Sequence, residues 1–191
     1  VQALLKKAAG LDIQMLLPLH GFVWRQDLGY ILGKYDLWSR YEPEQRGVVI
    51  AYASVYGGTE NAANILACRL REQGVQVEMF DTSVTPASYI LAAAFRFSHV
   101  VLAAPTYNGG VFVTMENLLH DLTAHGLKGR RAAYIENGSW APTSARGMQK
   151  LLEPLNWETA ADTVTLRSAL RQGQQEDLER MAAQLAESVK A

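Results

Sequence analysis

The sequence lacks the residues from which a disulfide-bonded, thiolate-metal or membrane-embedded protein is built. It contains one cysteine, Cys68, in 191 residues. A single thiol excludes an intramolecular disulfide and any zinc or iron–sulfur site that needs several thiolates. No apolar run approaches the roughly 20 residues that a membrane-spanning helix requires. We therefore expect a protein of the reducing cytoplasm that is not inserted in a membrane.

An excess of charge of either sign is also missing. There are 18 basic and 19 acidic side chains, for a formal net charge of -1, so no basic footprint for nucleic acid is present. The 49% of hydrophobic residues suffice for a buried core of one domain with an appendage. The first residues, Val1 to Ala9, include no initiator methionine and no secretory signal pattern, from which we expect a piece of a longer protein.

From Val48 onward, short apolar runs alternate with longer amphipathic stretches, the pattern of a parallel sheet with helices on both faces. The predicted strands are Val48 to Ala53, Val75 to Phe80, His99 to Ala104, Arg131 to Glu136 and, as a polar edge strand, Thr163 to Leu166. The predicted helices are Thr59 to Gln73, Pro86 to Phe95, Val113 to His125, Thr143 to Leu152 and Gln174 to Val189. With right-handed crossovers, this predicts a flavodoxin-like α/β/α sandwich whose five-stranded parallel sheet has the order 2-1-3-4-5.

Residues 1–47 do not continue the alternation. They hold one apolar run, Ile13 to Leu17, followed by an aromatic-rich stretch from Trp24 to Tyr41. We interpret this part as an appendage or the end of a preceding domain, with the boundary between Glu42 and Gly47. The predicted units are therefore residues 1–46 and 47–191.

The loop after the first strand, Ser54 to Asn61, predicts a phosphate site. Its glycines let backbone N–H groups approach an anion at a helix N-terminus, and Ser54 and Thr59 add hydroxyl donors. Neither the spacing of a nucleoside triphosphate loop nor that of a dinucleotide loop is present, and Lys and Arg are absent, so the loop suits one monophosphate. The alternative is an ordinary turn with Thr59 as helix N-cap. The candidate residues are Ser54, Val55, Tyr56, Gly57, Gly58 and Thr59.

The loops after the third and fourth strands are candidates for holding a flat ring. Tyr107 can line or stack on such a ring, and Asn108 and the backbone of Gly109 can bond its polar edge. Trp140 is the favoured stacking residue, although a tryptophan in a loop more often serves packing. The candidate residues are Pro105, Thr106, Tyr107, Asn108 and Gly109 in one loop and Asn137, Gly138, Ser139 and Trp140 in the other.

The stretches 52–61, 104–110 and 136–140 together resemble the three flavin loops of the A-type flavoproteins, or flavodiiron proteins, which join a metallo-β-lactamase-like di-iron domain to a C-terminal flavodoxin-like domain. Leu17 to Arg25 is similar to the family's Pro-x-His-Gly-x-x-Trp-Arg, and Tyr35 to Ser39 fits its connector. Gly109 departs from the pattern, since many members have asparagine there.

The resemblance implies FMN as the cofactor, and residues 1–46 as the end of the di-iron domain with its connector. In the full-length protein, FMN would relay electrons from rubredoxin or a flavin/NADH reductase to a di-iron centre that reduces dioxygen to water or nitric oxide to nitrous oxide. The family works as a homodimer. The histidine matching His20 is an iron ligand there, but the other histidines, His99, His120 and His125, belong to no His-x-Glu-x-Asp-His cluster. These 191 residues alone are thus expected to transfer electrons without reducing either gas.

Three other interpretations share parts of the pattern. A stand-alone flavodoxin or flavin-dependent quinone reductase has similar loops, but the His-Gly-x-x-Trp-Arg stretch argues against it. A receiver-type signalling domain needs clustered aspartates, whereas the first and third strands end in Ser54 and Pro105. A binding module that has lost its cofactor stays open.

Overall fold

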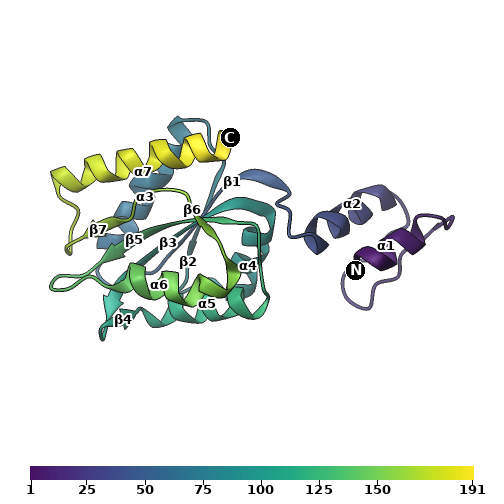
Figure 1. Ribbon diagram of the computed structural model, residues 1–191, viewed down its shortest axis with the longest axis horizontal. Helices are drawn as coiled ribbons and strands as arrows, with labels where there is room; N and C mark the ends of the chain where they lie inside the picture. The colour runs from purple at the N-terminus through teal and green to yellow at the C-terminus, as the bar shows by residue number, and fades with distance from the viewer.

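A computed structural model describes residues 1–191 and shows a twisted parallel sheet between two layers of helices, with an N-terminal arm to one side (Figure 1). Four strands lie in the order β2-β1-β3-β5, all parallel. They are β1 (Gln45–Tyr52), β2 (Val77–Asp81), β3 (Phe97–Tyr107) and β5 (Arg131–Asn137). The fifth position is filled by two short strands that both pair parallel with β5, namely β6 (Glu158–Thr159) and β7 (Val164–Leu166). The predicted order 2-1-3-4-5 is confirmed.

The division of the fifth strand was not predicted. One edge strand was predicted, at Thr163 to Leu166, whereas β6 pairs with the first two residues of β5 and β7 with its last three. Both residues of β6 are polar and exposed, so no apolar alternation marks them. A further two-residue strand, β4 (Gly110–Val111), turns back antiparallel on the end of β3.

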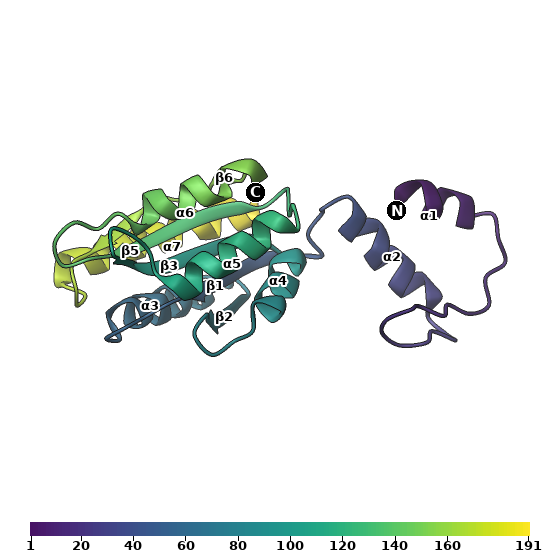
Figure 2. The same ribbon diagram turned by 90° about the horizontal axis from the view of Figure 1, so that it is seen from below.

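The helices form two outer layers, above and below the sheet in Figure 1, and Figure 2 views the molecule from the side of α5 and α6. On one face lie α3 (Gly58–Glu72) and α7 (Gln172–Lys190); on the other lie α4 (Ala87–Arg96), α5 (Val113–Ala124), α6 (Ser144–Leu152) and the 3-10 turn η1 (Glu153–Leu155). Each predicted helix occurs within two residues of its expected ends. None of the helices combines the length and apolar composition needed to cross a membrane.

Alternating strand residues supply the two hydrophobic cores. Val49 and Ala51 of β1 pack with α4, α5 and α6, whereas Val48 and Ile50 pack with α3 and α7. Successive side chains of a strand point to opposite faces, and both faces are covered. This explains why β1 reads as a continuous apolar run.

The N-terminal arm, residues 1–44, contains α1 (Gln2–Ala8) and α2 (Leu28–Ser39) and extends away from the sheet (Figure 1). A single antiparallel bridge joins Leu16 to Trp24. Ile31 is the only buried residue of the arm. The arm therefore has no hydrophobic core comparable to those around the sheet.

The arm is tied to the rest of the chain by Arg130, whose side chain is buried at 2% exposure. Its guanidinium donates to the carbonyl oxygens of Ala94 (2.7 Å), Phe95 (2.6 Å) and Tyr41 (2.6 Å). Two of these carbonyls end α4, which runs into β3 without a loop. Burial lowers the pKa of Arg130 to about 10, so the group keeps its charge at neutral pH. A cation also suits the negative end of a helix.

Candidate cofactor-binding site

A cavity of about 570 Å³ opens where the carboxyl ends of the strands meet. It is lined by residues of four loops: Ser54, Val55, Tyr56, Gly58 and Thr59 after β1; Pro105, Thr106, Tyr107 and Phe112 around the β3–β4 turn; Asn137, Gly138 and Ser139 after β5; and Ser168 and Ala169 after β7. None of these side chains carries a charge. A cavity of this size and position is typical of ligand sites in open α/β sheets.

The N-terminus of α3 supplies free backbone donors to this edge. Its N-cap is Gly57, at φ +82°, and no side chain caps the helix. The N–H groups of Gly58, Thr59 and Glu60 donate to no protein atom, because the first bond of the helix runs from Asn61 N to Gly57 O (2.8 Å). The N-cap role considered for Thr59 is wrong, since Thr59 lies within the first turn. Three unused donors at the positive end of a helix can bind an anion.

Thr59 adds a hydroxyl whose hydrogen is also unused. Its side chain is 2% exposed, and its Oγ1 accepts a bond from Nδ2 of Asn137 (3.3 Å). A hydroxyl that accepts one bond can still donate another, yet Thr59 Oγ1 donates to no atom of the protein. Buried donors are normally satisfied, so a free one that lines a cavity suits a bound acceptor.

The N-terminus of α6, at the same edge, is satisfied by the protein itself. Thr106 Oγ1 accepts from the N–H groups of Thr143 (2.8 Å) and Ser144 (3.1 Å). The carboxylate of Glu136 accepts from Ala145 N (3.1 Å) and also from the hydroxyl of Thr165 (2.9 Å). The first N–H groups of α6 thus have protein acceptors, whereas those of α3 have none.

Two of the aromatic candidates, Tyr56 and Tyr107, line the cavity. Tyr107 is half exposed, with its ring edge-on to Phe112 at 5.6 Å between centroids. Tyr56 is 98% exposed and Trp140 is 92% exposed. Trp140 does not line the cavity. Exposed aromatic rings at a cavity mouth can cover a flat ligand.

Asn108 and Gly109 were predicted to bond the ring, but the structure places them in the two-residue turn that joins β3 to β4. Both have positive φ, +49° and +75°, the geometry of the Asn-Gly hairpin turn. Neither lines the cavity, nor does Gly57. The Asn-Gly pair was a hairpin signal that the sequence analysis did not use. Contact of these residues with a ring stays a prediction.

The loop after β7 was missed. Ser168 and Ala169 line the cavity, although the segment Arg167 to Ala169 has no glycine or aromatic residue to mark it. Phe112 was missed as well. The available signal was topological, because the fifth parallel position must end at the same edge of the sheet as the others.

The predicted iron ligand His20 lies exposed in the N-terminal arm. No group of three or more His, Cys, Asp or Glu side chains in the chain has the arrangement to hold a metal ion. His99 is buried and hydrogen-bonded through its two ring nitrogens to Ser98 (2.8 Å) and Ser188 (2.9 Å). Burial, and secondarily the charge of Arg131, lowers its pKa to about 4.

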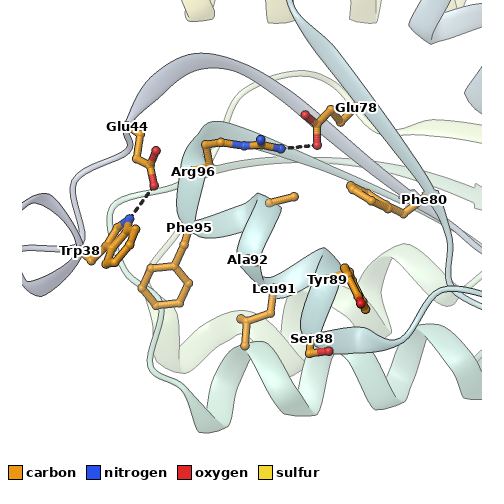
Figure 3. A pocket seen from close by; sticks show the side chains of 11 residues that line it. Trp38, Glu44, Glu78, Phe80, Ser88, Tyr89, Leu91, Ala92, Phe95 and Arg96 are labelled. Atoms are coloured by element: carbon orange, nitrogen blue, oxygen red, sulfur yellow. Dashed lines mark hydrogen bonds and ion pairs between the residues drawn. The ribbon is translucent and has the colours of Figure 1, made fainter. Parts of the chain in front are cut away.

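A second hollow, of about 810 Å³, lies between the end of α2 and α4 and shares no residue with the cavity (Figure 3). Trp38 donates to Glu44 (2.6 Å), and Arg96 pairs with Glu78 across the hollow. The Nε atom of Arg96 has no hydrogen-bond acceptor and is buried, so solvent does not reach it. The charged side chains of this hollow are thus paired, whereas the hydroxyls of Ser88 and Tyr89 bond no other side chain.

No protein-family model matches the chain. It is similar to curated relatives that include the nitric oxide reductase of Moorella thermoacetica (29% identity over 143 residues, 75% of this chain and 35% of the relative). Another is the rubredoxin-oxygen oxidoreductase of Megalodesulfovibrio gigas (23% identity over 185 residues, 96% of this chain and 46% of the relative). The alignments thus cover most of the chain but less than half of either relative.

Solved structures of related proteins also superpose on this chain. A flavodoxin of Streptococcus pneumoniae superposes on 74% of this chain and 98% of its own length, with a TM-score of 0.64 and 23% identity. The fold is flavodoxin-like. The rubredoxin oxygen:oxidoreductase of Desulfovibrio gigas superposes on 99% of this chain and 48% of its own length, with a TM-score of 0.90 and 22% identity. The flavodoxin-like fold and the N-terminal arm together therefore match about half of that longer protein.

Proposed function

We propose that the cavity binds FMN, with the phosphate at the N-terminus of α3 and the ring system toward Tyr107 and Trp140. The observation that carries the proposal is the set of unused donors on the first turn of α3, together with the buried hydroxyl of Thr59. A phosphate monoester offers acceptors to every one of them. The lining residues are uncharged, which suits one monophosphate better than a triphosphate with its metal ion.

The lining of the cavity beyond the proposed phosphate also suits FMN. Ser54 and the backbone of Val55 to Gly58 surround the proposed phosphate, and Pro105 to Gly109 and Asn137 to Trp140 flank the proposed ring. The volume of about 570 Å³ falls in the range of cofactor sites. The exposed rings of Tyr56 and Trp140 are free to pack on a planar ligand.

When bound, FMN supplies one- and two-electron transfer. The residues of the chain bind it, orient it and limit its contact with water. No Asp, Glu, His, Lys, Arg or Cys lines the cavity, so the lining offers no acid–base pair for converting a substrate. This supports electron transfer as the role of the site.

We further propose that the chain is the FMN domain of a flavodiiron-type oxidoreductase, in which residues 1–46 belong to a preceding di-iron domain and its connector. In that protein, His20 would be an iron ligand, rubredoxin or a flavin/NADH reductase the electron donor, and dioxygen or nitric oxide the acceptor, in a cytoplasmic homodimer. The names of the relatives and their greater length support this. So does the arm, where Leu17, Leu19 and Phe22 are between 71% and 97% exposed. Exposed apolar side chains grouped in this way are typical of a surface that another part of a protein covers.

A stand-alone flavodoxin or a flavin-dependent quinone reductase remains the second candidate, because its cofactor site would look the same. The arm distinguishes the two candidates. A flavodoxin matches only 74% of the chain, whereas the rubredoxin oxygen:oxidoreductase matches 99%.

Binding of FMN to the purified chain tests the proposal, measured by the quenching of flavin fluorescence. Thr59→Val removes the hydroxyl and nearly preserves the shape, so we expect about a tenfold loss of affinity from one lost hydrogen bond to a charged group. Thr123→Val is the matched control, because the Thr123 hydroxyl bonds the carbonyls of Leu119 (2.9 Å) and Leu151 (3.1 Å) away from the cavity. Failure of the unmodified chain to bind FMN would overturn the proposal.

A further inference from the structure

Ser168, in the loop after β7, is held in an unfavourable backbone conformation at the edge of the cavity. Its φ of +67° is uncommon for a residue other than glycine. Its N–H donates to Oδ1 of Asn137 (2.9 Å) and its carbonyl accepts from Nδ2 of the same residue (2.9 Å). Its hydroxyl bonds that of Ser139 (2.7 Å). A strained residue persists only where its surroundings enforce the conformation, and here they do so from the loop after β5.

The same loop touches the first turn of α3. A Cβ added to Gly58 would lie 2.4 Å from the carbonyl oxygen of Ser168 and 3.2 Å from Nδ2 of Asn137. Any side chain at position 58 would push the two segments apart. The N-terminus of α3 and the loop after β7 are therefore packed backbone to backbone beside the free donors.

Asn137 joins these two segments. Its side-chain nitrogen donates both to Thr59 Oγ1 (3.3 Å) and to Ser168 O (2.9 Å), and its oxygen accepts from Ser168 N. Both N–H hydrogens of the amide are therefore used, and the residue is 7% exposed. The Asn137 amide nitrogen therefore has no hydrogen left for a ligand in this arrangement.

The bond to Thr59 has a directional consequence. Because the Asn137 amide donates to Thr59 Oγ1, one lone pair of that oxygen is occupied, and the hydroxyl hydrogen must point away from Asn137. Thr59 lines the cavity. Such a chain of bonds also polarises the hydroxyl and strengthens it as a donor.

We propose that Asn137 is a positioning residue that aims the Thr59 hydroxyl at the phosphate of the bound cofactor and holds the loop of Ser168 as a fourth wall of the site. This inference rests on the proposed binding of FMN. It adds that Asn137 sets the preference of the site for FMN over riboflavin, the same flavin without the phosphate. A residue that only stabilised the fold would change the affinity for both flavins together.

The test compares the dissociation constants of FMN and riboflavin for the full chain and for Asn137→Leu, which keeps the branched shape of the side chain and removes all three bonds. We expect the FMN affinity to fall on the order of 10- to 100-fold while the riboflavin affinity stays within about threefold. Gln184→Leu is the matched control. The Gln184 amide holds another loop in the same way, through Asp162 N (3.0 Å) and the Asp162 carboxylate (2.9 Å), and we expect both constants to stay unchanged.

Thermal unfolding of the unliganded variants establishes that each is folded. If Asn137→Leu is unfolded, Ser168→Ala and Asn137→Asp take its place. We expect Ser168→Ala to lose only the bond to Ser139 and to have a small effect, and Asn137→Asp to reduce the preference for FMN by placing a negative charge beside the phosphate. Equal losses for both flavins, or no loss for either, would overturn the inference and leave the FMN site standing. Failure of the unmodified chain to bind either flavin would instead overturn the proposed function.

Discussion

Replacing Arg130 with leucine tests how α4 and the N-terminal arm are held to the sheet. The guanidinium donates to five carbonyl oxygens, those of Ala94, Phe95, Tyr41, Lys128 and Gly129, at 2.6 to 3.1 Å. The carbonyls of Ala94, Phe95 and Tyr41 accept no bond from any other turn or loop N–H. Leucine fills part of the space but leaves these acceptors without donors.

The expected loss follows from those acceptors. A buried acceptor left unsatisfied costs about 1 to 3 kcal/mol, but water will reach some of the three, and removal of a buried charge offsets part of the loss. We therefore expect unfolding free energy to fall by about 3 to 5 kcal/mol. For a domain of this size this lowers the melting temperature by about 6 to 20 °C.

The measurement is thermal unfolding followed by circular dichroism, with Arg180→Leu as the matched control. Arg180 pairs with Asp177 on the surface of α7, with more than half of its side chain exposed, so its loss is worth less than about 1 kcal/mol. Arg130→Lys should fall between the two, because an ammonium has only three donors and no planar fork. A melting temperature for Arg130→Leu equal to that of the control would refute the reasoning.

Three further predictions concern pH, close packing and capping. His99 is neutral in the folded protein at pH 7, because its pKa is about 4 there against about 6.5 in the unfolded chain. Its contribution to the stability of the folded state is therefore complete above pH 6.5 and is lost as the pH falls toward 4. Urea unfolding should show that the free energy of unfolding is lower at pH 4.5 than at pH 7 by about 2 to 3 kcal/mol because of this group. His99→Gln should make this difference smaller, whereas His120→Gln, at an exposed position, should leave it unchanged. Gly58→Ala should lower the free energy of unfolding by about 1 to 3 kcal/mol and weaken FMN binding. Gly29→Ala in α2, where a Cβ meets nothing within 4 Å, should leave the stability unchanged or raise it, so equal melting temperatures for the two variants would contradict this. Thr106→Val should cost about 1 to 2 kcal/mol in urea unfolding by freeing two N–H groups of α6, and an unchanged midpoint would show that water replaces the hydroxyl.

The sequence predicted the elements that have strong local signals. The buried strands are apolar throughout, and α3 ends where Gly74, at φ +77°, follows its C-cap. The exposed strand β6 has two polar residues and no periodicity, so only its pairing with β5 creates it. The role of Arg130 was invisible for a similar reason, because its partners are backbone carbonyls of distant segments, which no side-chain pattern marks.

The candidate site also combines features that have local sequence signals with features that depend on distant contacts. The glycine-rich loop and the helix start that follows it are local features, and the structure places their free donors at the cavity. Whether a hydroxyl or amide is free depends on its partners in space. Thr106 and Asn137 were predicted to bind a cofactor and both line the cavity, but the sequence did not show that Thr106 also caps α6 or that Asn137 also bonds Thr59 and Ser168.

The contrast between α3 and α6 explains why, of these two helices, we place the proposed phosphate at α3. Both helices begin beside the cavity, and both follow a strand of the parallel sheet. At α6, Thr106 and the carboxylate of Glu136 occupy the donors and place a negative charge at the positive end of the helix. At α3, Gly57 provides no side chain and Ser54 bonds only Gly57 N (3.1 Å), so the donors beyond it stay open. In the proposed site, these donors direct a phosphate to α3, and a planar group attached to it would extend toward Tyr107 across the lining that the other loops provide.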